Sequence, residues 1–213
     1  MAGAAMAEFK LSKMLPRAIK LFKDPKGFWQ EMATERGGIG AVMPSVIVFV
    51  AASGVAGFIG TLLGVLMNSI LRPFFGRMIV AGLLGLVVGV ALGVGVWFVF
   101  AILIKAFAKT FDASDEMEGA SKVAFGSLLP MWIAGLLQLI PFGFMTWIAT
   151  LGGLGYGCFM CYLGVQEIMA APKEKAIGYT AATMGITFVI VLVGGSILGV
   201  ISACFVGGAI LAG

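Results

Sequence analysis

Four long stretches of the chain contain no charged side chain, and they determine the predicted fold class. They cover residues 37–71, 78–104, 123–166 and 176–213. A helix that crosses a bilayer needs roughly 20 consecutive apolar residues, so each stretch is long enough to span a membrane. None of them shows the period-2 alternation of a membrane β-barrel. The pattern therefore predicts an all-α integral membrane protein.

The lengths of these stretches predict five transmembrane helices. The stretch 123–166 is about twice the length of one span, so it should hold two helices joined by a turn at Pro141 and Gly143. The last stretch is slightly short for two spans and a turn, and we expect one helix followed by an apolar tail. The predicted spans are 40–67, 78–105, 122–140, 143–167 and 176–203, within a transmembrane domain of residues 40–213.

The composition is consistent with a protein whose surface faces lipid. Hydrophobic residues make up 61% of the chain and charged residues 11%. Soluble domains contain about 45–50% apolar and about 25% charged residues. The apolar excess is too large for a buried core, so much of it must face lipid. The basic residues that give the net charge of +4 flank the predicted spans, which indicates topology signals and no nucleic-acid partner.

Lysine and arginine are distributed unevenly among the predicted loops. Of the 14 basic residues, only Arg72 and Arg77 fall between the first and second spans. The others precede the first span or fall in the second-to-third and fourth-to-fifth loops: Lys10, Lys13, Arg17, Lys20, Lys23, Lys26, Arg36, Lys105, Lys109, Lys122, Lys173 and Lys175. Because cytoplasmic loops are enriched in Lys and Arg, we expect the N-terminus in the cytoplasm and the C-terminus on the far side.

Residues 1–39 form a predicted N-terminal arm. Apolar residues recur in it at helical spacing from Leu11 to Phe22. The basic residues that fall largely on the opposite face are Lys13, Arg17 and Lys20. Such a basic amphipathic helix suits the surface of an anionic membrane. Pro16 would either kink this helix or begin it.

A second arm helix is predicted to begin at Asp24 and Pro25. The aspartate would cap the helix, and the proline would take its first position. This helix would stop at Gly37–Gly38, and its Phe28 and Trp29 would anchor in the headgroup region of the bilayer. Glu31 is a further candidate contact residue of the arm. Two interpretations of the arm stay open: it recruits a partner, or it lies on the membrane and fixes topology and tilt.

Glycines four residues apart recur in the predicted spans. They are Gly60 and Gly64; Gly85, Gly89 and Gly93; Gly153 and Gly157; and Gly195 and Gly199. Small residues at this spacing let helices approach closely, either within one chain or between the chains of a homo-oligomer.

Ser127, Pro130 and Gln138 interrupt the apolar character of the third span. They would line a cavity or hinge in a transporter, whose path would also include the tyrosines Tyr156, Tyr162 and Tyr179. Alternatively, Pro130 would form a static kink whose freed carbonyl is satisfied by a neighbouring helix.

A group of polar residues follows the fourth span. It comprises Glu167, Pro172, Lys173, Lys175 and Tyr179. We expect Glu167 to form an ion pair with Lys173 or Lys175 at the membrane edge. The acidic residues Asp112, Asp115, Glu116 and Glu118 lack the spacing of an EF-hand and predict a solvated loop.

No catalytic, cofactor or metal site is predicted. The chain has no histidine, which removes the commonest general base and the usual zinc ligand. Cys158 and Cys161 form a Cys-x-x-Cys pair inside a span, without a second pair. We interpret them as small buried apolar residues.

Several segments carry a family resemblance through their order and spacing. They are Phe22–Glu31 (FKDPKGFWQE) with Thr34-Glu35, Ala52–Gly60, Ser127–Gly135 with Leu139-Ile-Pro141, Tyr162–Met169, and Pro172–Thr180. Together they resemble the prokaryotic branch of the Yip (Ypt-interacting protein) domain family, from about Leu21 to Ala203. The resemblance implies five helices, a cytoplasmic N-terminus and a short far-side C-terminus.

The resemblance also implies a class of function. Eukaryotic members of the family bind Rab-type GTPases and one another and act in vesicle traffic. This chain lacks the Asp-Leu-Tyr-Gly-Pro segment that those members carry before the first span, which does not favour GTPase binding. We expect a non-enzymatic scaffold or adaptor of a bacterial inner membrane that binds membrane proteins or itself. The alternative is a transporter or channel for a small solute, ion or lipid.

Overall fold

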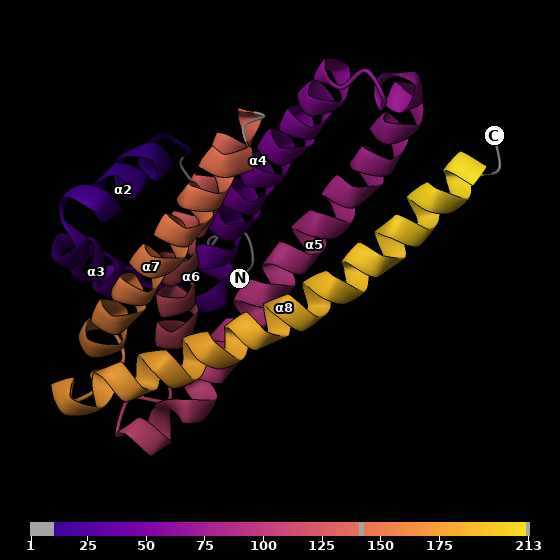
Figure 1. The fold of residues 1–213 in the computed structure, drawn as a ribbon. Coiled ribbons are helices and arrows are strands. Elements are labelled where there is room, and N and C mark those ends of the chain that lie inside the picture. The colour runs from indigo at the N-terminus through magenta and orange to yellow at the C-terminus, as the bar shows by residue number, and fades with distance from the viewer. Residues whose placement is uncertain (1–10, 141–142, 212–213) are drawn as a thin grey trace.

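The described part of the chain folds into two short α-helices and five long ones, with short 3₁₀ turns between some of them (Figure 1). The computed structural model describes the backbone of residues 11–140 and 143–211, with side chains for residues 14–140 and 143–196. Within these ranges there is no strand. The N-terminal arm contains α2 (Leu11–Lys23) and α3 (Pro25–Thr34).

Five long helices follow the arm. They are α4 (Gly38–Met67), α5 (Phe75–Ala108), α6 (Met117–Gly135), α7 (Gly143–Glu167) and α8 (Lys173–Leu211). Among the described residues, five helices are long and apolar enough to cross a membrane. A helix satisfies its backbone hydrogen bonds internally, which is what a chain inside lipid requires. The predicted fold class, an all-α membrane protein with five spanning helices, is confirmed.

Several helix boundaries differ from the predicted ones. Helix α6 begins at Met117 instead of 122, because Glu118 and Lys122 pair one turn apart at 2.9 Å and both fit inside the helix. It ends at Gly135 and continues as a 3₁₀ turn, η3 (Leu136–Leu139). The predicted turn residue Pro141 lies outside the described residues. Helix α8 extends to Leu211 and not to Ala203.

The arm helices have the predicted start signals in part. Asp24 caps α3 by accepting a hydrogen bond from the Gly27 amide at 2.9 Å, and Pro25 takes the first helical position, both as predicted. Pro16 lies inside α2 and does not begin it. Gly37 (φ 127°) and Gly38 (φ 55°) join the arm to α4. Both φ values lie in the left-handed region that favours glycine, so this junction depends on the two glycines.

Side-chain packing is concentrated at one end of the bundle. We call this the near end; it carries the arm, the 3₁₀ turn η2 (Lys109–Phe111) and the α7–α8 turn. The far end carries the α4–α5 turn with η1 (Arg72–Phe74). The largest fully buried side chains of the core include Trp29, Trp97, Phe100, Phe125, Met160 and Tyr179. Helix α6 lies at the centre, in contact with α4, α5 and α7.

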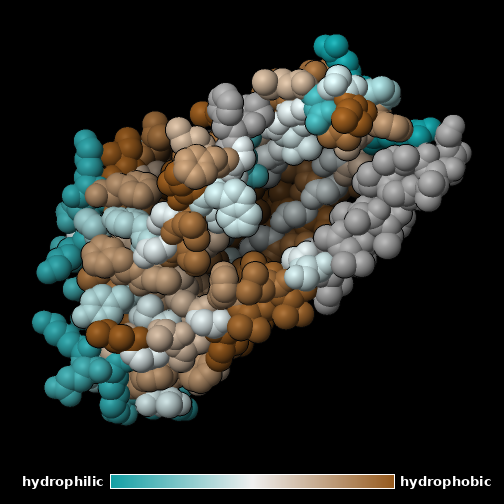
Figure 2. Space-filling model, in the orientation of Figure 1, coloured by the Kyte–Doolittle hydropathy of each residue, from teal (hydrophilic) through white to brown (hydrophobic). Residues whose placement is uncertain are grey.

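The far half of the bundle exposes apolar side chains instead. Those of α4 and α5 include Ile59, Leu63, Leu66, Val80, Leu83, Leu84 and Val87. Figure 2 shows hydrophilic residues gathered towards the ends of the molecule, with a broad hydrophobic region between them. A surface this apolar is stable only in contact with lipid or another apolar surface.

Candidate functional site at the near end

The first attachment of the arm to the bundle is the side chain of Trp29 on α3. Its indole is fully buried between Gly126 of α6 and Gly164 of α7. A Cβ atom added at Gly126 would lie 2.4 Å from Cη2 of Trp29, and one at Gly164 would lie 2.7 Å from Cζ2. Real atoms do not approach this closely, so only glycine at both positions leaves room for the indole.

Phe28 completes this aromatic contact. It is 1% exposed, and its ring meets that of Trp29 edge-on with centroids 5.1 Å apart. The prediction that these two rings anchor in the headgroup region is wrong, because both are buried inside the protein. Helical spacing and aromatic character are the same for a ring in a protein notch as for one in a membrane interface, so the sequence did not separate the two environments.

Charged residues fasten the arm at its ends. Arg17 of α2 forms an ion pair with Glu35, which follows α3, and Lys20 pairs with Glu31 at 2.7 Å. Lys122 of α6 is only 4% exposed, and its ammonium donates to the Glu35 carbonyl oxygen and, at 2.9 Å, to the Glu118 carboxylate. A buried cation is tolerated when its donors are satisfied in this way. The network therefore links α2, the α3–α4 junction and α6.

Two of these predicted surface residues therefore act within the chain. Arg17 and Lys20 pair with carboxylates of the arm itself, so lipid phosphates are not their sole partners. The side chain of Lys13 lies outside the described residues. The sequence places Lys122 among the basic residues of the second-to-third loop. No local pattern indicates that its side chain is buried or that it contacts Glu35.

Tyr156 of α7 provides a third attachment for the arm. Its hydroxyl donates to the Leu21 carbonyl oxygen at 2.7 Å, and its ring stacks on that of Phe22 with centroids 5.1 Å apart. Leu21 is fully buried, whereas Leu15 and Ile19 on the other side of α2 are exposed. The arm thus has one face in the protein and one apolar face turned outward.

Loop charges at the near end pair differently from the prediction. Lys175 pairs with Asp112, and Lys109 pairs with Asp115 at 3.0 Å. In the part of the chain that the structure describes, Glu167 forms no ion pair with Lys173 or Lys175, so that prediction is wrong. The η2 turn brings Asp112 to α8, a proximity that separation along the chain does not reveal. The Lys109 hydrogen bond lowers the pKa of the Asp115 carboxyl.

Tyr179 connects α8 to α5 and is not a loop residue. It is fully buried, its hydroxyl donates to the Ile104 carbonyl oxygen, and its ring stacks on that of Phe111 with centroids 5.1 Å apart. Pro172 and Lys173 are exposed in the same region. The near end therefore combines a rigid interior with charged side chains on its surface.

The residues predicted to line a cavity or hinge lie apart from one another. Ser127 is buried and donates to the Val123 carbonyl oxygen at 2.7 Å, one turn earlier. Pro130 is also buried, and its carbonyl oxygen lies 3.1 Å from a Cβ position at Gly153. Gln138 is exposed. The structure does not bring these three side chains to one cavity.

The glycines four residues apart serve two different purposes. Gly153 and Gly157 pack α7 against α6; a Cβ at Gly157 would lie 2.6 Å from the Ser127 carbonyl oxygen. Gly93 faces Val50 of α4. Gly85 and Gly89, by contrast, have no atom within 4 Å of an added Cβ.

Cys158 is half-buried and Cys161 buried, and both are free thiols. Among the described residues, no group of three or more His, Cys, Asp or Glu side chains is placed to hold a metal ion.

These features define a polytopic helical membrane protein with an arm docked into one end of its bundle. The sequence profile of the Yip1 domain matches residues 19–195, which is most of the chain, so this protein belongs to the Yip1 domain family. The match begins within α2 and ends within α8, so it includes α3 and the last turn of α2. No curated protein and no solved structure matches the chain.

Proposed function

We propose that this protein is a non-enzymatic membrane scaffold of the Yip type, and that partner proteins bind the near end on the cytoplasmic side of a bacterial inner membrane. The observation that carries the proposal is the docked arm. Trp29, Tyr156 and Lys122 fasten the arm to α6 and α7, so the near end is a preorganised surface. A preorganised surface loses little conformational entropy when a partner binds.

The near-end surface has the polar character that a water-exposed binding face needs. Its exposed charged residues include Lys26, Lys109, Asp115, Glu116, Lys173 and Glu174. The far end, by contrast, carries Arg72 and Arg77 as its charged side chains among the described residues. Charged surface residues select partners and speed their association, which supports binding at the near end over binding at the far end.

The transporter alternative has less support. The residues that would line a path are either closed in the core, as Ser127 and Pro130 are, or exposed, as Gln138 is. The tyrosines Tyr156 and Tyr179 donate to backbone carbonyl oxygens of neighbouring segments. Hydroxyl protons that are already donated to the backbone are not available to a solute.

Site-specific photo-crosslinking in the native membrane tests the proposal. A photoreactive residue at Lys173 or Glu116 should capture the same partner protein, and one at Asn68 in the far-end turn should not. The double charge reversal K109E/K173E should weaken this capture. Equal capture from both ends, or a strictly monomeric protein without a partner at the near end, would contradict the proposed function.

A further inference from the structure

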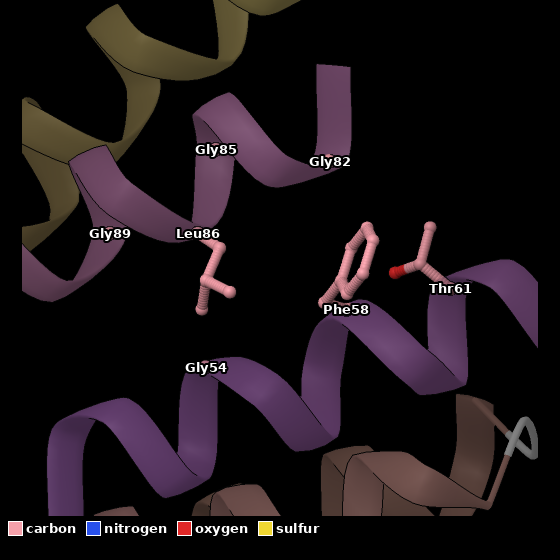
Figure 3. A pocket seen from close by; sticks show the side chains of 7 residues that line it. All are labelled: Gly54, Phe58, Thr61, Gly82, Gly85, Leu86 and Gly89. Carbon is pink, nitrogen blue, oxygen red and sulfur yellow. The ribbon is translucent and has the colours of Figure 1, made fainter. Parts of the chain in front are cut away.

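An apolar groove lies between α4 and α5, on the far-end side of the core (Figure 3). It has a volume of about 230 Å³. Phe58 and Thr61 project into it from α4, and Leu86 projects from α5. Figure 2 shows a recess with hydrophobic residues around it in the region where α4 and α5 diverge in Figure 1.

The groove exists because the two helices touch at some glycines and part at others. A Cβ at Gly54 would lie 2.8 Å from Leu86 Cδ1, and one at Gly82 would lie 2.5 Å from Phe58 Cε2. Gly85 and Gly89, one and two turns further along α5, face open space instead. The backbone of α5 is therefore bare along the groove, and a thin, flexible chain can lie directly against it.

The lining favours an apolar occupant. The hydroxyl of Thr61 donates to the Gly57 carbonyl oxygen of its own helix at 2.8 Å, so the hydroxyl proton is already used. The other lining side chains, Phe58 and Leu86, are hydrocarbon. A polar solute would lose its water shell without gaining hydrogen bonds there.

Positive charge lies above the groove at the far end. Arg72 is exposed in η1, the turn that closes the α4–α5 hairpin. No Asp or Glu occurs in the sequence between Glu35 and Asp112, so neither α4, α5 nor their turn carries a carboxylate side chain. An anionic group from the membrane suits this position.

The spacing between the charge and the groove matches one lipid molecule. Gly82 and Gly89 lie seven and fourteen residues after Phe75, the first residue of α5, which is about 10 and 21 Å along the helix axis. Half of a bilayer, headgroups included, is about 20 Å thick. A phosphate held by Arg72 at the level of the α4–α5 turn would therefore place its acyl chain at the depth of the groove.

We propose that the α4–α5 groove binds one acyl chain of an anionic phospholipid whose phosphate is held by Arg72. This site is at the opposite end of the bundle from the proposed partner surface and does not depend on it. A second copy of the chain is the competing occupant of the open glycines, and the experiment below distinguishes the two.

The chain offers a matched control for each half of this site. Arg77 lies on the first turn of α5, but five residues before Gly82 correspond to about 140° around the helix axis, so it lies on another face. Gly95 is also on α5 and also has no atom within 4 Å of an added Cβ, but it does not line the groove. The informative variants are R72Q and G85L/G89L, and their controls are R77Q and G95L.

Native mass spectrometry of the full-length protein measures lipid retention from micelles that contain phosphatidylglycerol and phosphatidylcholine with identical acyl chains. The wild type should retain one phosphatidylglycerol molecule in preference to phosphatidylcholine. R72Q should lower that preference about fivefold, and G85L/G89L should lower retention of both lipids. R77Q and G95L should behave as the wild type.

Three results would overturn the proposal. One is unchanged lipid retention in G85L/G89L; a second is an effect of R77Q equal to that of R72Q. The third is a loss of dimers with unchanged lipid retention, which would assign the glycines to a second copy. A phosphatidylglycerol with a photoreactive acyl chain provides a check on the wild type itself. It should label Phe58 or Leu86, and labelling spread evenly over all lipid-facing helices would also contradict the site.

Discussion

Replacement of Trp29 by alanine tests how strongly the arm is attached. The substitution removes a fully buried indole from the notch between Gly126 and Gly164. Loss of a buried Phe or Trp side chain costs about 3–5 kcal/mol. The indole N–H has no hydrogen-bond partner among the described residues, and an unpaired buried donor costs about 1–3 kcal/mol. The two contributions oppose each other, so we expect a net loss of about 2 kcal/mol.

This loss should appear first as local opening of the arm. A change of about 2 kcal/mol makes the opening equilibrium about 30-fold more favourable. Lys20, Lys23 and Lys26 lie in the arm, so trypsin reports on its opening when cleavage is slow relative to closing. W29A in micelles should be cut in the arm far faster than the wild type.

Trp147 of α7 provides the matched control, because it is 71% exposed. W147A removes the same side chain without leaving a cavity, so arm cleavage should stay at the wild-type rate. If W29A and W147A were cleaved at the same rate, the indole would not hold the arm, and the reasoning from burial would be refuted.

Three further predictions concern neighbouring contacts. K122M should destabilise the protein by about 1–3 kcal/mol in denaturant unfolding, since it removes the donor to the Glu35 carbonyl oxygen and the ion pair with Glu118. K26M at an exposed lysine should cost less than about 0.5 kcal/mol, and equal effects of the two variants would contradict a buried role for Lys122. G157V should lower the free energy of unfolding by about 1–3 kcal/mol, because its side chain clashes with the Ser127 carbonyl oxygen. G152V should be tolerated, since a Cβ added at Gly152 meets no atom within 4 Å. The same loss of stability in both variants would exclude tight α6–α7 packing as the cause. Lys109 lowers the pKa of the Asp115 carboxyl below its ordinary value of 3.8. The stability that this pair contributes is therefore complete above pH 3.8 and is lost as the pH falls through the lowered pKa. A carboxyl-carbon NMR titration of Asp115 with a midpoint at or above 3.8 would contradict the pairing.

The transmembrane architecture was predictable because one physical requirement controls it. A chain in hydrocarbon must be helical and uncharged over a fixed length, and the uncharged stretches of this sequence record that length directly. The start of α3 was also predictable, because the cap of Asp24 and the position of Pro25 are local interactions.

The docked arm was not predictable, since its contacts join residues far apart in the sequence. Nothing near Trp29 indicates that Gly126 and Gly164 form a notch for it, and neither glycine belongs to a four-residue repeat. The partner of Lys175 was missed for a similar reason. Glu167 is nearer along the chain, but the fold brings Asp112 closer. Local sequence patterns showed that the arm is amphipathic. They could not show whether its apolar face packs against the membrane or against the helix bundle.

The location of Trp29 is the most direct test of an arm that belongs to the bundle. The chain has 4 tryptophans. The triple variant W97F/W132F/W147F leaves Trp29 as the single tryptophan emitter, and W97F/W132F/W29F leaves Trp147. In bilayers containing brominated lipids, Trp147 should be strongly quenched and Trp29 should be protected from both the lipids and aqueous iodide. Strong quenching of Trp29 by lipids brominated near the headgroup would contradict the docked arm and place it on the membrane surface.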